Sequence, residues 1–325
     1  MLENKNSFPK RISYFITYKC NFSCPYCYLP EEFFHKRKEK TVTEIIRAFQ
    51  KIGIEQIDVL GGEPFLEQEK LNNFLTSCLN ASIKIKSIST NGLIINNETL
   101  SLLETIKGVT VLVSLDAATP ATYKIIRNSP YFFRVIENIK VLVERKIRVV
   151  LGFTITKDNF KEIGKFMTLA RRLKVNGISV GSYIPVGRGQ KIENRFLNNE
   201  EMIWIYNLIK KNKDLLNIYG IKEKGCPAGT EELAIIPNGD VYPCGLFINF
   251  KETKLGNIFD KEIDFSSHKY FSDLLKCEIP NRCLSCCLPS LCPGACKAFI
   301  YSKFRSFSSK SRKFIQYHKY PCKNL

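Results

Sequence analysis

Short apolar segments alternate with amphipathic segments from residue 11 to about residue 214, and this alternation restricts the fold more than any other feature. The predicted strands are Arg11–Thr17, Gln56–Leu60, Ile83–Ile88, Val109–Leu115, Ile147–Ile155 and Gly177–Val180. The predicted helices are Thr41–Ile52, Glu67–Leu79, Asn97–Ile106, Phe132–Arg145 and Asn159–Leu173. Strands joined by helical crossovers pair in parallel. We therefore expect an α/β fold, a partial (β/α)6 barrel with ligand sites at the carboxyl ends of its strands.

The remainder of the chain differs in composition from the part before it. Of the thirteen cysteines in the sequence, nine lie from Cys226 onward. Residues 235–242 contain an Asn-Gly pair between two apolar stretches, which predicts a tight β-hairpin. We expect residues 1–215 to form the barrel and residues 216–325 to form a cysteine-rich second domain that contains the hairpin.

Composition and charge narrow the class of protein. No apolar stretch approaches the ~18 residues that span a bilayer, and the first ten residues lack the apolar segment of a secretory signal. We therefore expect a cytoplasmic protein without membrane contacts, in which thirteen cysteines indicate bound metal rather than disulfides. The formal net charge of +18 favours acidic partners, such as nucleic acid, an acidic peptide or an acidic electron-transfer protein.

Three cysteines directly follow the first predicted strand, at Cys20, Cys24 and Cys27. A structural zinc site needs four ligands, and His35 is the nearest candidate for a fourth. Three thiolates on one loop suit a 4Fe–4S cluster instead, with the fourth iron left open to bind another molecule. The spacing therefore indicates an iron–sulfur site at the carboxyl end of the first strand.

Polar or glycine-rich motifs also follow the next three predicted strands, whereas the fifth has no such motif. The motifs are Gly61-Gly62-Glu63-Pro64, Ser89-Thr90-Asn91-Gly92 and Ser114-Leu115-Asp116, with Arg127 further along the chain. Each alone is weak evidence, because glycine pairs, capping residues and arginines are common at strand ends. All of them in order, behind a Cx3Cx2C cysteine motif, resemble the radical SAM superfamily.

The resemblance implies that the open iron binds the amino and carboxylate groups of S-adenosylmethionine (SAM). An aromatic residue at the position of Tyr26 lies near the adenine in this family. The other residues that correspond to SAM contacts are Gly61, Gly62, Glu63, Pro64, Ser89, Asn91, Ser114, Asp116 and Arg127. The glycines admit the methionine moiety, the acidic residue accepts from its ammonium group, and the arginine pairs with its carboxylate. A 5′-deoxyadenosyl radical formed from SAM then removes hydrogen from an unactivated C–H bond.

Seven of the later cysteines have a second recognisable spacing. They are Cys226, Cys244, Cys283, Cys286, Cys292, Cys296 and Cys322. A zinc ribbon would use only four of them. The whole set resembles the SPASM domain, which implies two auxiliary 4Fe–4S clusters and therefore three clusters in the chain. By this resemblance Cys283, Cys286, Cys292 and Cys322 hold the outer cluster, whereas Cys226, Cys244 and Cys296 hold the inner one.

Two departures from the sulfatase-maturating enzymes of this family concern the inner cluster. Those enzymes have a further cysteine where this chain has Gly220, and an aspartate base where it has Gly245. We therefore expect no formylglycine formation, and an inner cluster with an open iron or an unusual fourth ligand. Cys287 could be that ligand or a hydrogen-atom donor. Cys78 and Cys277 have no assigned role, and an ordinary buried thiol is the simplest interpretation for Cys78.

The SPASM resemblance favours an enzyme that matures a ribosomally synthesised peptide. An open iron could bind a substrate thiolate, and a nearby cluster could accept an electron. We therefore favour oxidative cross-linking, through a thioether or a C–C bond, over epimerisation. The alternatives are an enzyme acting on a haem precursor, a quinone precursor or a sugar, and a non-enzymatic nucleic-acid-binding protein. The last would use the basic, aromatic segment Lys297–Leu325, for which a solvated face is the simpler interpretation.

Two kinds of partner are expected besides the substrate. A flavodoxin- or ferredoxin-type electron donor would reduce the first cluster. The barrel begins near Arg11, which leaves no room for an amino-terminal leader-binding domain. We therefore expect a separate leader-recognition protein, or the barrel and SPASM surfaces themselves, to hold a peptide leader that is acidic.

Overall fold

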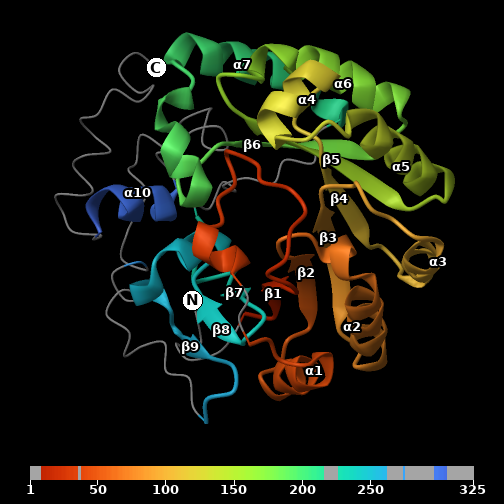
Figure 1. The fold of residues 1–325 in the computed structure, drawn as a ribbon, viewed down its shortest axis with the longest axis vertical. Helices are drawn as coiled ribbons and strands as arrows, with labels where there is room; N and C mark the ends of the chain where they lie inside the picture. The colour runs from red at the N-terminus through yellow and green to blue at the C-terminus, as the bar shows by residue number, and fades with distance from the viewer. Residues whose placement is uncertain (1–8, 36–37, 216–225, 262–273, 275–295, 306–325) are drawn as a thin grey trace.

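Six parallel strands form the first part of the sheet in the computed structural model of the chain (Figure 1). The structure describes residues 9–35, 38–215, 226–261, 274 and 296–305. The six strands are β1 (Arg11–Phe15), β2 (Gln56–Leu60), β3 (Lys84–Thr90), β4 (Thr110–Ser114), β5 (Arg148–Ile155) and β6 (Gly177–Ser182). They lie in chain order, each hydrogen-bonded to the next. All six predicted strands are confirmed, and β3 and β6 extend slightly beyond the predicted ends.

Three short strands from the later part of the chain continue the same sheet. They are β7 (Ala234–Ile235), β8 (Asp240–Tyr242) and β9 (Gly256–Asn257). β7 pairs in parallel with β1 and antiparallel with β8, so the sheet order is β6-β5-β4-β3-β2-β1-β7-β8-β9. The outer edge of β1 is therefore covered by β7 rather than by β6. The barrel is open, as six strand–helix units predict.

The hairpin predicted around the Asn-Gly pair joins β7 to β8. The Ile236 N–H donates to the Asp240 carbonyl oxygen at 3.1 Å across a turn of residues 236–239. Gly239 has a φ of +91°, a conformation that glycine adopts without strain. The Asn238 side chain accepts from the Asp240 N–H at 3.1 Å and stabilises the turn. The predicted hairpin is confirmed.

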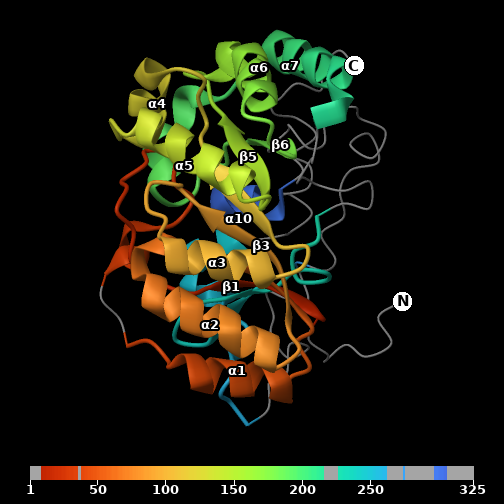
Figure 2. The ribbon, with the colours of Figure 1, turned by 90° about the vertical axis from the view of Figure 1, so that its right-hand side faces the viewer.

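Helices cover the outer face of the barrel, and Figure 2 shows α1, α2 and α3 stacked along one side of it. The α-helices in the described residues are α1 (Val42–Lys51), α2 (Gln68–Asn80), α3 (Asn97–Thr105), α4 (Pro120–Arg127), α5 (Phe132–Glu144), α6 (Ile163–Arg172), α7 (Asn199–Lys211) and α10 (Lys297–Phe304). Short 3-10 helices span Glu31–Phe34, Pro64–Glu67, Phe160–Glu162, Gly187–Arg195, Lys213–Leu215, Gly245–Asn249 and Lys251–Thr253. None of the described helices is both long and apolar enough to cross a membrane.

The five predicted helices are confirmed, but α4, α7 and α10 were not predicted. α4 begins at Pro120, where the missing N–H of proline is not needed, and Thr119 caps its first turn. Asn198 caps α7 through a capping box with Glu201. Thr-Pro and Asn-Asn pairs also occur in turns, so the sequence did not predict α4 or α7.

The two faces of the barrel strands have different chemistry. Toward the helices, Val111, Val113 and Phe153 are almost completely buried in the apolar core. Parallel strands covered by helices need such side chains on the covered face. Toward the interior, Arg11 of β1 and Asp58 of β2 line a cavity. The strands therefore bring polar groups inside the barrel.

Candidate functional site

The loop after β1 carries the three predicted cluster cysteines and packs against the loop after β2. The Gly62 N–H donates to the Thr17 carbonyl oxygen at 2.9 Å, and the Glu63 N–H donates to that of Lys19 at 2.7 Å. A Cβ atom on Gly62 would lie 2.1 Å from the Lys19 carbonyl oxygen, so only glycine permits this approach. The glycine that the resemblance assigns to the methionine moiety therefore also positions the cysteine loop.

Of the three thiols in this loop, that of Cys24 is buried and those of Cys20 and Cys27 are partly buried. Burial raises the pKa of Cys20 to about 11 and that of Cys27 to about 12, and it also raises the pKa of Cys24. Cys24 Sγ donates to the Arg127 carbonyl oxygen at 3.6 Å. Bound iron would deprotonate these thiols and compensate the charge of the thiolates, so the loop fits an iron–sulfur cluster.

A single metal ion requires a different arrangement. In the described part of the chain, no group of three or more His, Cys, Asp or Glu side chains is arranged to hold one ion. A 4Fe–4S cluster is larger, because each thiolate ligates its own iron atom. Three thiols on one loop are compatible with that larger group.

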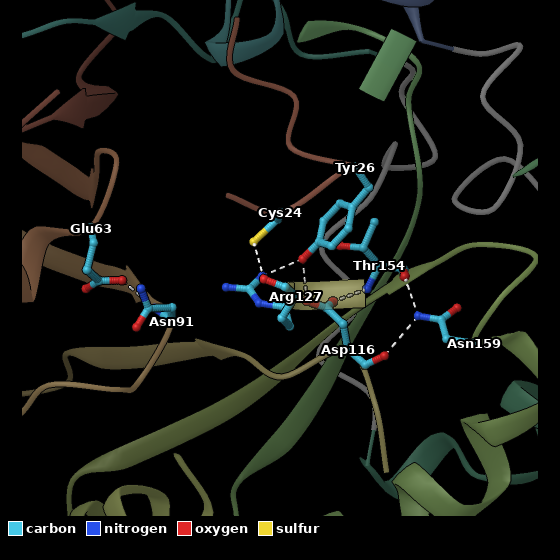
Figure 3. Close-up of polar contacts among 8 residues, drawn as sticks. All are labelled: Cys24, Tyr26, Glu63, Asn91, Asp116, Arg127, Thr154 and Asn159. Carbon is cyan, nitrogen blue, oxygen red and sulfur yellow. Dashed lines mark hydrogen bonds and ion pairs between the residues drawn. The ribbon is translucent and has the colours of Figure 1, made fainter. Parts of the chain in front are cut away.

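Glu63 is buried between the loops after β2 and β3, where Figure 3 shows it beside Asn91. Its carboxylate accepts from the Phe65 N–H at 3.0 Å, the Asn91 N–H at 2.6 Å and the Thr90 hydroxyl at 2.7 Å. Burial raises the pKa of Glu63, and these hydrogen bonds oppose the rise. A carboxylate has about four acceptor positions, so one remains for another donor such as the SAM ammonium group.

Tyr26, Asp116 and Arg127 form a buried hydrogen-bonded group beside the cysteine loop (Figure 3). Arg127 Nη1 lies 3.0 Å from Asp116 Oδ2 and also donates to the Tyr26 hydroxyl. The Tyr26 hydroxyl in turn donates to Asp116. Among the described residues, the buried Nε of Arg127 has no hydrogen-bond partner. A buried, unpaired guanidinium N–H is costly, so this atom fits an anionic group such as the SAM carboxylate.

The end of β5 also supports this group, although the sequence showed no motif there. Asp116 Oδ1 accepts from the Thr154 N–H at 2.6 Å, and Asn159 Nδ2 donates to the Asp116 carbonyl oxygen at 2.9 Å. Figure 3 shows both residues beside Asp116. Asn159 Oδ1 also accepts from the Thr156 N–H at 2.8 Å. This Thr-x-x-Asn pattern is the sequence signal that could have identified the fifth strand end.

The remaining predicted SAM contacts lie at the same edge of the sheet. Gly61 and Pro64 flank the loop after β2, and Pro64 begins the 3-10 helix there. Ser89 lines the barrel interior, and Ser114 is the last residue of β4. The structure thus brings the predicted SAM contacts to the carboxyl ends of β1–β4, as the sequence motifs require. Their roles toward SAM remain predictions.

A cavity of about 900 Å³ runs from the barrel interior to the predicted inner-cluster cysteines. Cys226, Cys244 and Cys296 line one part of it, and Phe15 of β1 and Leu112 of β4 line another. Burial raises the pKa of Cys244 and raises that of Cys296 to about 12, and the proximity of Cys226 contributes to both. The structure therefore brings these three cysteines together beside the barrel interior.

Charged side chains that the sequence analysis did not identify also line this cavity. Arg11 donates to Asp58 through two nitrogens, at 2.6 and 2.9 Å, and the Ser87 hydroxyl donates to Asp58 at 2.6 Å. Glu232 accepts from the Ser13 hydroxyl at 3.3 Å, and its charge helps to raise the pKa of Cys244. Side chains on β1, β2 and β3 alternate between two faces. In the sequence, Arg11, Asp58 and Ser87 therefore cannot be told from the ordinary polar residues of a strand.

Gly245 stands where sulfatase-maturating enzymes have an aspartate base. A Cβ atom there would lie 2.9 Å from the ring of Phe15 and 3.6 Å from that of Tyr28. A larger residue would need the Phe15 ring to move. The rings of Phe15 and Tyr28 thus pack around a glycine at this position.

Several predicted residues lie outside the described residues. They are Gly220, Cys277, Cys283, Cys286, Cys287, Cys292 and Cys322. The fourth ligand of the inner cluster and the whole outer cluster therefore remain predictions. Cys78, by contrast, is fully buried in α2 and lies in the apolar core, as the simplest interpretation expects.

The fold and the site together indicate a class of protein. The open parallel barrel carries three thiols on one loop, with buried acceptors and donors at the neighbouring strand ends. This arrangement is typical of an enzyme that uses an iron–sulfur cluster and a small charged cofactor. Comparison with protein families agrees. Residues 14–170 match the Radical SAM superfamily, and residues 226–287 match the SPASM iron–sulfur cluster-binding domain, which together exceed half of the chain. The chain belongs to the radical SAM superfamily and carries a SPASM domain.

Individual relatives differ in what they act on. The antilisterial bacteriocin subtilosin biosynthesis protein AlbA of Bacillus subtilis is 28% identical over 272 residues, 79% of this chain and 59% of its own length. The AdoMet-dependent heme synthase of Methanosarcina barkeri is 24% identical over 331 residues, 90% of this chain and 93% of its own. Streptococcus suis SuiB, solved with its precursor peptide SuiA, has the same fold with a TM-score of 0.71 and 22% identity. That match covers 93% of this chain and 74% of SuiB. The chain thus spans about three fifths of AlbA.

Proposed function

We propose that this protein uses SAM to modify a ribosomally synthesised peptide, by oxidative cross-linking through a thioether or a C–C bond. The observation that carries the proposal is the cavity of about 900 Å³, which places Cys226, Cys244 and Cys296 beside the barrel interior. A peptide segment in that space would contact both the barrel strands and the inner cysteine group. AlbA is a subtilosin biosynthesis protein, and SuiB was solved with its precursor peptide. The similarity of this chain to both supports a peptide substrate.

The residues of the first site have separable roles in this proposal. Cys20, Cys24 and Cys27 hold the radical-generating cluster, and Tyr26 lies beside the adenine. When bound, the cluster and SAM together supply a 5′-deoxyadenosyl radical that removes hydrogen from the substrate. Arg127 binds the SAM carboxylate through Nε, and Asp116 holds the guanidinium in place. The glycine-rich loop after β2 keeps the cysteine loop in position.

The second site would remove the remaining electron. Cross-linking takes two hydrogens from the peptide, one as a hydrogen atom and the other as a proton and an electron. Cys226, Cys244 and Cys296 would hold the inner of two auxiliary clusters, which could accept that electron, in a SPASM domain that we assign to residues 216–325. In this assignment the protein holds three 4Fe–4S clusters and receives electrons from a flavodoxin- or ferredoxin-type donor. An acidic peptide leader is held by a separate leader-recognition protein or by the barrel and SPASM surfaces themselves.

A small-molecule substrate is the second candidate. The match to the heme synthase of Methanosarcina barkeri extends over nearly the full length of both chains, whereas AlbA is much longer than this chain. A haem precursor could enter the same cavity. Epimerisation of a peptide, with Cys287 as hydrogen donor, is a third outcome that the same experiment distinguishes.

The experiment is anaerobic reconstitution with iron and sulfide, addition of SAM and a reductant, and mass analysis of peptides encoded beside the gene. Cross-linking lowers the peptide mass by two hydrogens. The variant with Cys20, Cys24 and Cys27 changed to alanine should leave the peptide mass unchanged. A product of unchanged mass that carries one solvent deuteron at an α-carbon would indicate epimerisation. Turnover of a haem precursor with no change in any peptide would favour the second candidate.

A further inference from the structure

The surface where α4 meets α5 exposes large apolar side chains. Ile125, Tyr131 and Phe133 are 55%, 51% and 67% exposed. Figures 1 and 2 show α4 and α5 next to each other at the β4–β6 end of the sheet. Single exposed apolar residues are ordinary on a protein surface, but three within nine positions form a patch that needs a partner. We call Ile125, Tyr131, Phe133 and the neighbouring Lys124 and Arg134 the α4–α5 corner.

The α4–α5 corner is positively charged. The sequence has no acidic residue between Asp116 and Glu137, whereas the exposed Lys124 and Arg134 lie in that interval. Lys124 is exposed, and Arg134 lies 3.6 Å from Glu137 in an ion pair whose side chains are both about 60% exposed. Such exposed pairs are weak. An apolar patch with cations beside it suits an acidic protein that binds briefly.

The end of α4, next to this corner in the sequence, contacts the loop of the first cluster. The Arg127 carbonyl oxygen accepts from Cys24 Sγ at 3.6 Å, and Figure 3 shows Arg127 beside Cys24. Asn128, the left-handed residue that ends α4, donates through Nδ2 to the Ser23 hydroxyl at 2.9 Å. Ser23 and Asn128 are both exposed, whereas Cys24 is buried directly behind them. The end of α4, which lies in sequence between Ile125 and Tyr131 of the corner, is therefore in direct contact with the cluster loop.

An electron has to reach this cluster from another protein before SAM can be cleaved. Electrons pass between redox centres only over short distances, so the donor has to dock where the protein layer over the cluster is thin. Electron-transfer complexes are small and transient, and opposite charges steer their formation. We propose that the α4–α5 corner is the docking surface for an acidic one-electron carrier of the flavodoxin or ferredoxin type. This inference rests on the proposed function, because it requires a cluster at Cys20, Cys24 and Cys27.

The test compares two reductants in cleavage of SAM without any peptide. The variant Ile125→Ser/Phe133→Ser should raise the KM for reduced flavodoxin by about tenfold or more, the usual loss when anchoring side chains are truncated. Its rate with dithionite, a small molecule that needs no docking surface, should equal that of the wild type. The matched control is Leu79→Ser/Trp204→Ser, which removes two exposed apolar side chains from α2 and α7. This control should change neither the KM for flavodoxin nor the rate of SAM cleavage with dithionite.

A second variant tests the charge and keeps the fold of the patch. Lys124→Glu/Arg134→Glu should raise the KM for flavodoxin most strongly at low ionic strength and reduce its dependence on salt. The matched control is Lys51→Glu/Lys210→Glu, on α1 and α7.

Three results would overturn the proposal. The first is an unchanged KM for flavodoxin in both corner variants. The second is an equal loss of SAM cleavage with flavodoxin and with dithionite. The third is a loss confined to peptide modification, which would indicate that the corner binds the peptide instead. Failure of the proposed function is distinguishable. If SAM cleavage itself failed, wild-type protein would form no 5′-deoxyadenosine with dithionite, whereas a substrate other than a peptide would leave this docking test unchanged.

Discussion

Arg127 joins three parts of the first site at the residue scale. Its guanidinium contacts Asp116 from the end of β4 and Tyr26 from the cysteine loop, and its carbonyl oxygen accepts from Cys24. Its side chain is only 8% exposed, and Nε has no partner among the residues that the structure describes. A buried ion pair with one unused donor contributes little to the stability of the fold. The unused donor is well suited to bind an anion.

Replacing Arg127 should therefore weaken SAM binding. Arg127→Lys keeps the charge but loses the planar fork of donors, so we expect the Kd for SAM to rise by about tenfold or more. Equilibrium dialysis with reconstituted protein measures this. Arg134→Lys, at an exposed position on α5, is the matched control and should bind SAM like the wild type. Equal affinity in both variants would contradict the assigned role.

The buried thiols make cluster loading a proton-releasing reaction. Burial raises the pKa of Cys20 to about 11 and of Cys27 to about 12, so both are protonated at pH 8 in the metal-free protein. Iron binds them as thiolates, so loading should release about one proton per ligand and become more favourable as the pH rises. A pH indicator in weak buffer during anaerobic loading measures the release. Cys20→Ser/Cys27→Ser should release fewer protons, and an equal yield would contradict cluster binding there.

At the scale of elements, the sequence predicted the barrel because each local signal agreed with the global fold. Apolar runs of strand length alternate with capped amphipathic segments, and Thr41 with Glu44 forms a capping box at the start of α1. α4 was missed because Pro120 usually indicates a turn, although here it occupies the first turn of a helix. The predicted site residues lie together because parallel strands end at one edge of the sheet.

Other parts of the site depend on contacts that sequence spacing does not encode. Asp116 is held by Thr154 through a backbone N–H, which any residue except proline could supply at that position. Arg11 and Asp58 are 47 positions apart, and only the register between β1 and β2 brings them opposite Ser87 inside the barrel. Long-range pairings of this kind follow from the completed sheet, so the charged interior of the cavity could not be predicted.

The contact between the cysteine loop and the loop after β2 depends on one glycine. Gly62→Ala would place a Cβ atom 2.1 Å from the Lys19 carbonyl oxygen, so the two loops should separate. We expect loss of about four irons, one cluster, and of SAM cleavage, measured by iron analysis and 5′-deoxyadenosine formation. Gly181→Ala is the matched control, because no atom lies within 4 Å of its added Cβ. Full iron content in Gly62→Ala would contradict the proposed role of this contact.

At the scale of the whole molecule, one sheet connects the two cysteine groups. β1 leads into the first cysteine loop, and its neighbour β7 belongs to the hairpin that leads to Cys244. Backbone hydrogen bonds between β1 and β7 therefore fix the two groups relative to each other without a hinge between them. Such a fixed separation suits electron transfer, which requires redox centres at constant spacing.

The number of clusters is the prediction that concerns the entire chain. If all assigned ligands are used, reconstituted protein should hold about twelve irons, in three clusters of four. Replacement of Cys20, Cys24 and Cys27 together by alanine should leave about eight irons and abolish SAM cleavage. Replacement of Cys226, Cys244 and Cys296 should also leave about eight but preserve cleavage of SAM. Unchanged iron content in either triple variant would contradict the ligand assignment.

The pairing of β1 with β7 also has a consequence for synthesis on the ribosome. Ser13 and Glu232, which flank this pairing, are 219 positions apart, so roughly 10–40 s of translation separate them. During that interval β1 can pair with β2, but its other edge has no strand beside it. Unpaired strand edges recruit other chains, so a nascent protein stalled before residue 234 should aggregate or require a chaperone. Lower growth temperatures slow translation and lengthen this exposure, so the yield of folded protein should depend on chaperone supply.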